Sequence, residues 1–251
     1  MARSFNGSTQ YLRNTNAVLS AIPFTMAGWW NYQGGTYGGD ECIVGIRDYD
    51  IGYESGPKLL ISIRDPVTQG DVKIQYAGVT YASIINTAIN SGWNHAAAVS
   101  SSSTSHYVYM NGTASTEGTN SASFGTVDTT VIGASAEGSS NLSDYFNGYL
   151  GEIGIWDAAL TSAEINALAA GVSPLLVRTG SLVSYWPLIR DEDQDRVGGY
   201  DMTAYNTPTV VAHPPVIYPA QVYQSFAAAA APPAGISIPV VMHHRRQLGM
   251  S

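Results

Sequence analysis

The sequence predicts an all-β protein, a sandwich or barrel of short strands with a single short helix. Runs of branched and aromatic residues recur at short spacing between turn residues, which is the pattern of such folds. The composition agrees, because the 251 residues include 26 Gly and 16 Tyr and only 12% are charged, about half the usual share for a soluble domain. One segment, 161–170, has a helical period instead of a strand period.

Strand signals follow one another along the first four fifths of the chain. We expect strands at 5–7, 11–12, 24–30, 42–46, 58–64, 72–76, 93–99, 106–110, 130–133, 145–156 and 182–188. Asn111-Gly112 predicts a hairpin turn, because both residue types tolerate positive φ. A second short helical turn is expected at 83–88.

The segment 146–168 predicts a strand that leads directly into the helix. Thr161 is the expected N-cap, and Glu164 stands three residues later, which makes a capping box. Leu160 and Ile165 occupy the flanking positions of a hydrophobic staple. Gly171 is the expected C-terminal stop.

A change of composition divides the chain into a body, residues 1–206, and an arm, residues 207–251. The arm contains no Asp, Glu or Lys, seven prolines and many large apolar side chains. Prolines favour extended geometry, and an extended apolar arm must lie on its own domain or on a neighbouring subunit. The residues predicted to bind the partner are Val222, Tyr223, Phe226, Ile236, Ile238, Val240, Arg245 and Arg246.

Charge and cysteine content exclude several classes of protein. The net charge of −8 and a pI of about 4.9 argue against nucleic acid as a partner. The single cysteine, Cys42, excludes an intramolecular disulfide framework, and we expect it to be buried. No apolar run has the length of a signal peptide or a membrane span, so we expect folding in a cytoplasm and no membrane partner.

Four segments together resemble the laminin-G-like, or concanavalin A-like, jelly-roll family. They are WNHAAAV at 93–99, YVYMNG at 107–112, FNGYLGEIGIW at 146–156 and GSLVSYWPL at 180–188. The resemblance extends over residues 3–206 and implies a jelly-roll sandwich of two antiparallel sheets packed face to face. Gly151 stands where the family usually has Asp, which removes a carboxylate and any metal or hydrogen-bonding role for it.

The resemblance also implies places for the tryptophans. Trp30, Trp93, Trp156 and Trp186 are expected in or beside the core. Trp29 adjoins Trp30 in a strand, so one of the two should face outward. Trp29, Tyr32 and Tyr37 are the predicted glycan-binding residues, with Tyr49 and Tyr53 as further aromatic side chains in nearby loops.

Catalytic and metal chemistry is not predicted. The carboxylate run E-x-D-x-x-E of the related glucanases does not occur, and Glu152 stands alone on its strand, although a glycosidase needs two carboxylates at one bond. The acidic run 191–195 lacks the Gly and Glu of an EF-hand loop, since Arg196 and Met202 stand in those places. That leaves a looser calcium site or a solvated turn. His95 is expected to be a hydrogen-bonded structural residue, and no cofactor is predicted.

Two functions are open on this basis. The main hypothesis is a non-enzymatic structural protein of a virus particle, such as a bacteriophage capsid decoration or tail-associated protein. Its arm would dock on neighbouring subunits. Its partners would be other virion proteins such as the major capsid protein, and further copies of itself in a homo-oligomer; it would be located in the virion after assembly in the host cytoplasm. The alternative is a carbohydrate-binding lectin or adhesin module with glycans as partners.

Overall fold

The protein divides into two units, Met1–Pro219 and Ala220–Ser251. The structure, a computed structural model, describes residues 2–34, 40–48, 58–64, 70–76, 79–86, 92–122, 125–136, 142–189 and 193–218. All of these residues belong to the first unit. The arm residues predicted to bind a partner lie outside the described residues.

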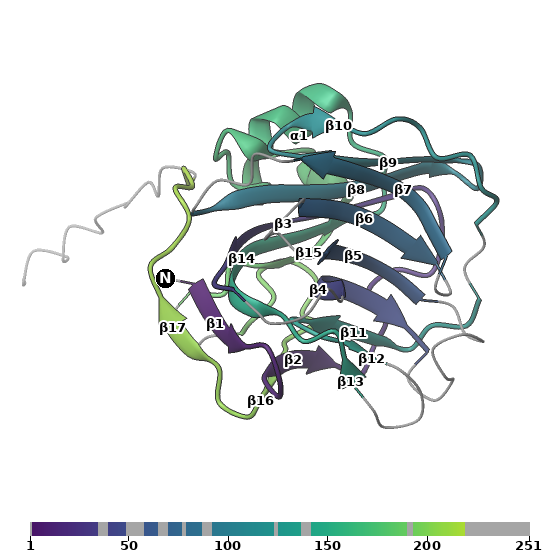
Figure 1. Ribbon diagram of the computed structural model, residues 1–251. Coiled ribbons are helices and arrows are strands. Elements are labelled where there is room, and N and C mark those ends of the chain that lie inside the picture. Colours follow the sequence, from purple (N-terminus) through teal and green to yellow (C-terminus); the bar gives the residue numbers. More distant parts are fainter. Residues whose placement is uncertain are drawn as a thin grey trace, which may run out of the picture. The chain divides into compact units, whose positions relative to one another are not determined.

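The described part of the chain is a sandwich of two antiparallel sheets, as predicted (Figure 1). In sheet A the strand order is β10-β9-β8-β3-β14-β1-β17, and β15 also pairs with β14. Its strands are β1 (Ala2–Asn6), β3 (Phe24–Tyr32), β8 (Asn94–Ser102), β9 (Ser105–Met110), β10 (Thr113–Ala114), β14 (Asn147–Trp156), β15 (Leu182–Trp186) and β17 (Thr209–Val211).

Sheet B faces sheet A across the core, in the strand order β16-β2-β11-β4-β5-β6-β7. Its strands are β2 (Tyr11–Asn14), β4 (Asp40–Arg47), β5 (Lys58–Arg64), β6 (Gly70–Tyr76), β7 (Val79–Asn86), β11 (Thr129–Ile132) and β16 (Thr203–Tyr205). Strands β12 (Ser135–Ala136) and β13 (Leu142–Ser143) form a small separate pair.

The hydrophobic core lies between the sheets and follows the period of two of each strand. On β3, Phe24, Met26 and Trp30 point inward and are fully buried. They pack against branched residues of sheet B such as Ile61 and Ile74. Trp186 lies in the same core, as expected for it.

The helical turn expected at 83–88 is wrong over its described part, because Ser83 to Asn86 lie in β7. Ala82 pairs with Ile74, and Ile84 pairs with Val72. Alternate residues of this segment therefore face the core, and strand pairing outweighs its weak helical signal.

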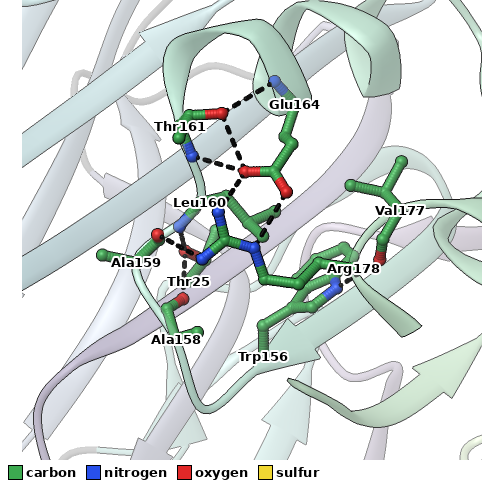
Figure 2. A network of polar contacts seen from close by, with 9 residues as sticks. All are labelled: Thr25, Trp156, Ala158, Ala159, Leu160, Thr161, Glu164, Val177 and Arg178. Atoms are coloured by element: carbon green, nitrogen blue, oxygen red, sulfur yellow. Dashed lines mark hydrogen bonds and ion pairs between the residues drawn. The ribbon is translucent and has the colours of Figure 1, made fainter. Parts of the chain in front are cut away.

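Helix α1 (Ser162–Ala169) begins with the predicted capping box (Figure 2). The Thr161 hydroxyl accepts from the Glu164 backbone N–H, and the Glu164 carboxylate accepts from the Thr161 N–H at 2.8 Å. Arg178 then holds that carboxylate through two hydrogen bonds of 2.8 and 2.6 Å. Two 3-10 turns, η1 (Pro174–Leu176) and η2 (Thr179–Ser181), follow the helix.

The helix covers part of the outer face of sheet A. Ile165 and Leu168 are buried in a second hydrophobic cluster with Ala27 of β3, Ala97 of β8 and Trp156 of β14. Trp156 is fully buried there, and its indole N–H donates to the Val177 carbonyl at 3.0 Å (Figure 2).

The compact body extends beyond the boundary predicted at residue 206. Strand β17 pairs with β1 at the edge of sheet A. The chain then returns along the body, where Ser173 N–H donates to Ile217 O at 3.1 Å and Ile217 N–H donates to Gly171 O at 2.6 Å. Proline content marks a change of backbone geometry at 207, whereas the first compact unit ends at Pro219.

Within the described residues, no helix is long and apolar enough to cross a membrane.

Candidate functional site

The outer face of sheet A continues past the helix into an aromatic surface. Trp29 and Trp30 face opposite sides of β3, as predicted, and Trp29 is on the outer side with Ala27. Register places His95 of β8 and Gly151 of β14 on either side of Trp29. Asn31 pairs with Tyr149 in the next outward row. We call Trp29, Asn31, Trp93, His95 and Tyr149 the aromatic patch.

Two ring contacts organise the aromatic patch. Trp93 and Tyr149 are both partly exposed, with ring centroids 6.4 Å apart and planes inclined at 49°. Trp29 and His95 meet edge to face at 5.5 Å. Trp29 keeps only 8% of its surface exposed, so Trp93 and Tyr149 provide most of the accessible aromatic surface.

His95 is the buried member of the aromatic patch. Burial lowers the pKa of its imidazole to about 3, so the ring is neutral at physiological pH. The Nδ1 atom has no hydrogen-bond partner among the described residues. His95 was expected to be a hydrogen-bonded structural residue. Its ring instead contacts Trp29, and its Nδ1 atom has no hydrogen-bond partner in the described part of the chain.

The predicted hairpin turn holds one end of the aromatic patch. Asn111 and Gly112 connect β9 to β10 with φ values of 49° and 84°, as a tight hairpin requires. The Asn111 amide oxygen accepts from the His95 N–H at 2.8 Å, and its amide nitrogen donates to Asn94 at 2.9 Å. The turn thus ties the start of β8 to the β9–β10 hairpin.

The structure places Trp29 and Tyr32, the two described members of the predicted glycan-binding set, on opposite faces of β3. Tyr32 packs against the core between the sheets, on the side of β3 opposite to Trp29. Tyr37 lies outside the described residues. Of the three predicted residues, Trp29 alone belongs to the aromatic patch, and a glycan-binding role for any of the three stays a prediction.

Trp93 was expected in or beside the core, and the structure shows it partly exposed and outside the core. Among the described residues, neither hydrophobic cluster includes Trp93 or Tyr149. Trp93 directly precedes β8 and continues its alternation, in which Ala97 and His95 face outward. Extending this alternation by one residue before the strand would have predicted that the Trp93 side chain faces outward.

The acidic run provides no open calcium site at its described members. Asp193 forms a buried ion pair with Arg3 at 2.5 Å. Asp195 accepts from the Ser184 hydroxyl and from backbone N–H groups of Tyr185, Val197, Gly198 and Tyr200. No group of three or more metal-binding side chains occurs in the described residues. Asp191 and Glu192 lie outside them.

A buried carboxylate, Glu152, follows Gly151 on β14. The Glu152 side chain is fully buried and accepts from the Tyr185 hydroxyl at 2.8 Å and the Tyr218 hydroxyl at 2.7 Å. Burial first, and then the charge of Glu152, raise the pKa of both tyrosines, which keeps them neutral donors. His213 Nε2 lies 3.0 Å from the same carboxylate. Glu152 therefore holds residues 213–218, the C-terminal strap, on sheet A.

Gly151 leaves room for the C-terminal strap. A Cβ at this position would lie 3.4 Å from both Ala2 and Pro214. A carboxylate would extend further in that direction, into the strap. The absence of the usual Asp at 151 is thus matched by the path of this chain's own C-terminal segment.

The outer face of sheet B carries different chemistry. Lys73 pairs with Asp40 at 2.5 Å, and both side chains are largely buried. Nearer the other edge, Tyr205 stacks on Tyr11 at 4.5 Å, and the Arg13 guanidinium lies 5.1 Å from its ring centroid. Tyr205 is partly exposed, like Trp93 and Tyr149, and its ring contacts Tyr11 and Arg13.

Comparison with protein families identifies the family to which this sandwich belongs. Residues 6–166 match the family model described as the concanavalin A-like lectin/glucanases superfamily. The chain belongs to this superfamily. Lectins and glucanases share it, so membership alone does not decide between binding and catalysis. No curated protein matches the chain in sequence.

Three solved structures show the same fold at low sequence identity. A heptameric SAP-like pentraxin from Limulus polyphemus is 18% identical, with a TM-score of 0.55, over 67% of this chain and 81% of the pentraxin. A candidate carbohydrate-binding protein from Bacteroides ovatus is 18% identical, with a TM-score of 0.60, over 86% of this chain and 61% of that protein. The NanB sialidase of Streptococcus pneumoniae is 17% identical, with a TM-score of 0.50, over 66% of this chain and 27% of the sialidase.

The match with the sialidase spans about a quarter of that enzyme, and the match with the Bacteroides ovatus protein spans under two thirds of it. None of the three is a virion protein. The virion role and the arm residues that would serve it stay predictions that these relatives do not support.

Proposed function

We propose that the protein is a non-catalytic carbohydrate-binding module and that the aromatic patch is its glycan site. The observation that carries this proposal is the partly exposed Trp93–Tyr149 pair on the outer face of sheet A, outside both hydrophobic clusters. Aromatic rings with one accessible face suit the apolar C–H face of a sugar ring.

Polar groups beside the rings complete such a site. Asn31 pairs with Tyr149 on the middle strand. Its amide oxygen accepts from the Gln33 side chain at 2.8 Å, which leaves the amide nitrogen to donate to a sugar hydroxyl. The central strands β3, β8 and β14 hold these side chains in a fixed register. A site on a rigid sheet loses little conformational entropy when it binds.

The absence of catalysis in this proposal rests on Glu152. It is the carboxylate nearest in sequence to the aromatic patch, its side chain is fully buried, and both of its oxygens accept hydrogen bonds. A glycosidase needs two carboxylates that reach the scissile bond, and Glu152 is committed to the C-terminal strap.

A glycan array probed with the full chain tests the proposal, with the double variant Trp93→Ala/Tyr149→Ala in parallel. We expect the wild type to bind one group of glycans and the double variant to lose at least tenfold in affinity for them. Tyr205→Ala is the matched control, because Tyr205 is a partly exposed, paired aromatic residue on sheet B. Wild-type binding that survives in the double variant, or no binding at all, would overturn the proposal.

A further inference from the structure

We infer that the aromatic patch selects neutral sugars over sugars that carry a carboxylate. This inference rests on the proposed glycan function and concerns the chemical class of the ligand. It follows from the sequences of the three strands and from where the described lysines and arginines lie.

The strands that form the aromatic patch contain no lysine or arginine. Strands β3, β8 and β14 read FTMAGWWNY, NHAAAVSSS and NGYLGEIGIW. The sequence segments that flank β3 and β8, GTYGG at 35–39 and TAINSG at 87–92, contain none either. His95, the one basic residue of the aromatic patch, is neutral at physiological pH because burial lowers its pKa to about 3.

Eight of the eleven lysines and arginines are among the described residues, and none of these eight lies on a strand of the aromatic patch. Five lie on strands of sheet B: Arg13, Arg47, Lys58, Arg64 and Lys73. Arg3, on sheet A, is 4% exposed and paired with Asp193. Arg178 is held by Glu164 beside the helix. Arg196 donates to Gln194, and Arg190, Arg245 and Arg246 lie outside the described residues.

A carboxylate sugar would meet an unfavourable field at this surface. Burying a carboxylate without a cation or several donors costs free energy, whereas a neutral hydroxyl needs fewer partners and can accept from the Asn31 amide nitrogen. Glu152 directly follows Gly151, the register partner of Trp29. The net charge of −8 adds a long-range repulsion of anions.

Matched pairs of oligosaccharides test this inference by calorimetric titration of the full chain. The probes are cellohexaose with its C6-carboxylate counterpart, and lacto-N-tetraose with its sialylated form. We expect the neutral member of at least one pair to bind at least tenfold more tightly than its acidic partner. Its affinity should change less than twofold between 50 and 500 mM NaCl, since no ion pair contributes.

The outcomes separate the two proposals. Tighter binding of the acidic members, with loss of that binding in Trp93→Ala, would overturn the inference and leave the glycan function standing. No binding of either member of any pair would overturn both the inference and the function. Asn31→Lys adds a cation to the aromatic patch. If charge sets the preference, this variant should reduce the ratio of neutral to acidic glycan affinity at least threefold.

Discussion

The two halves of one sheet face differ in what they leave exposed. Where helix α1 covers sheet A, Ala27, Ala97 and Trp156 are buried and the Trp156 N–H is hydrogen-bonded. Past the end of that cover, Trp93 and Tyr149 are partly exposed and the His95 Nδ1 has no partner among the described residues. The same strands run through both halves, so neighbouring elements, and not the strands themselves, decide which half stabilises and which half can bind.

The comparison predicts that substitutions in the covered half change stability and that those in the aromatic patch change binding. The largest effect is expected for Trp156→Ala, which leaves a large cavity under the helix. Its cost should be about 3–5 kcal/mol, measured by urea denaturation. Trp156→Phe keeps most of the volume and loses the hydrogen bond to Val177 O, so it should cost clearly less. A loss below about 1 kcal/mol for the Ala variant would show that the helix does not depend on this contact.

Gly151→Asp tests the boundary between the two halves. The added carboxylate would meet Pro214 and approach Glu152, so we expect a loss of about 1–3 kcal/mol and faster hydrogen exchange at Ile217. Gly151→Ala is the control, since its Cβ would make only ordinary 3.4 Å contacts. Equal stability of the Asp variant and the wild type would refute the role assigned to Gly151.

Thr161→Ala removes the N-cap of the helix and should cost about 1 kcal/mol, measured by thermal or urea unfolding. Thr161→Ser retains a hydroxyl and should lie close to the wild type. Because the cap is distant in sequence from the aromatic patch, glycan affinity should not change. A tenfold loss of affinity in the Ala variant would mean that the two halves are coupled.

The smallest effect is a pH dependence that arises from Glu164. The hydrogen bonds from Arg178 lower the pKa of this carboxyl from its usual 4.5 to about 2. A lowered pKa in the folded state stabilises the fold above pH 4.5, and the contribution disappears as pH falls toward 2. The Arg178–Glu164 pair is partly exposed, so its contribution to the free energy of unfolding should stay below about 1 kcal/mol. Glu164→Gln should flatten this part of the stability profile between pH 5 and 2, and an unchanged profile would contradict the assignment.

The sequence predicted most of the body because its signals are local. The capping box at Thr161 and Glu164 and the hairpin turn at Asn111-Gly112 are each contained in a few neighbouring residues, and both occur as expected. The two-sheet sandwich followed from ordered motifs.

The aromatic patch was harder to predict because it depends on distant neighbours. From the sequence, Trp93 was expected in or beside the core, and its outward position becomes clear only when the extent of the helix cover is known. Glu152 reads as isolated because Tyr218 and His213, which contact it, lie more than sixty residues later in the chain. Their place in a proline-rich segment led the sequence reasoning to assign them to an arm.

The most direct test compares Trp93→Ala with the wild type in two measurements on one sample, calorimetric titration with the tightest neutral glycan and urea denaturation. We predict at least a tenfold loss of affinity and a change in the free energy of unfolding within about 1 kcal/mol. Unchanged affinity would contradict a glycan site at the aromatic patch. A large loss of stability would mean that Trp93 serves the fold, as Trp156 does.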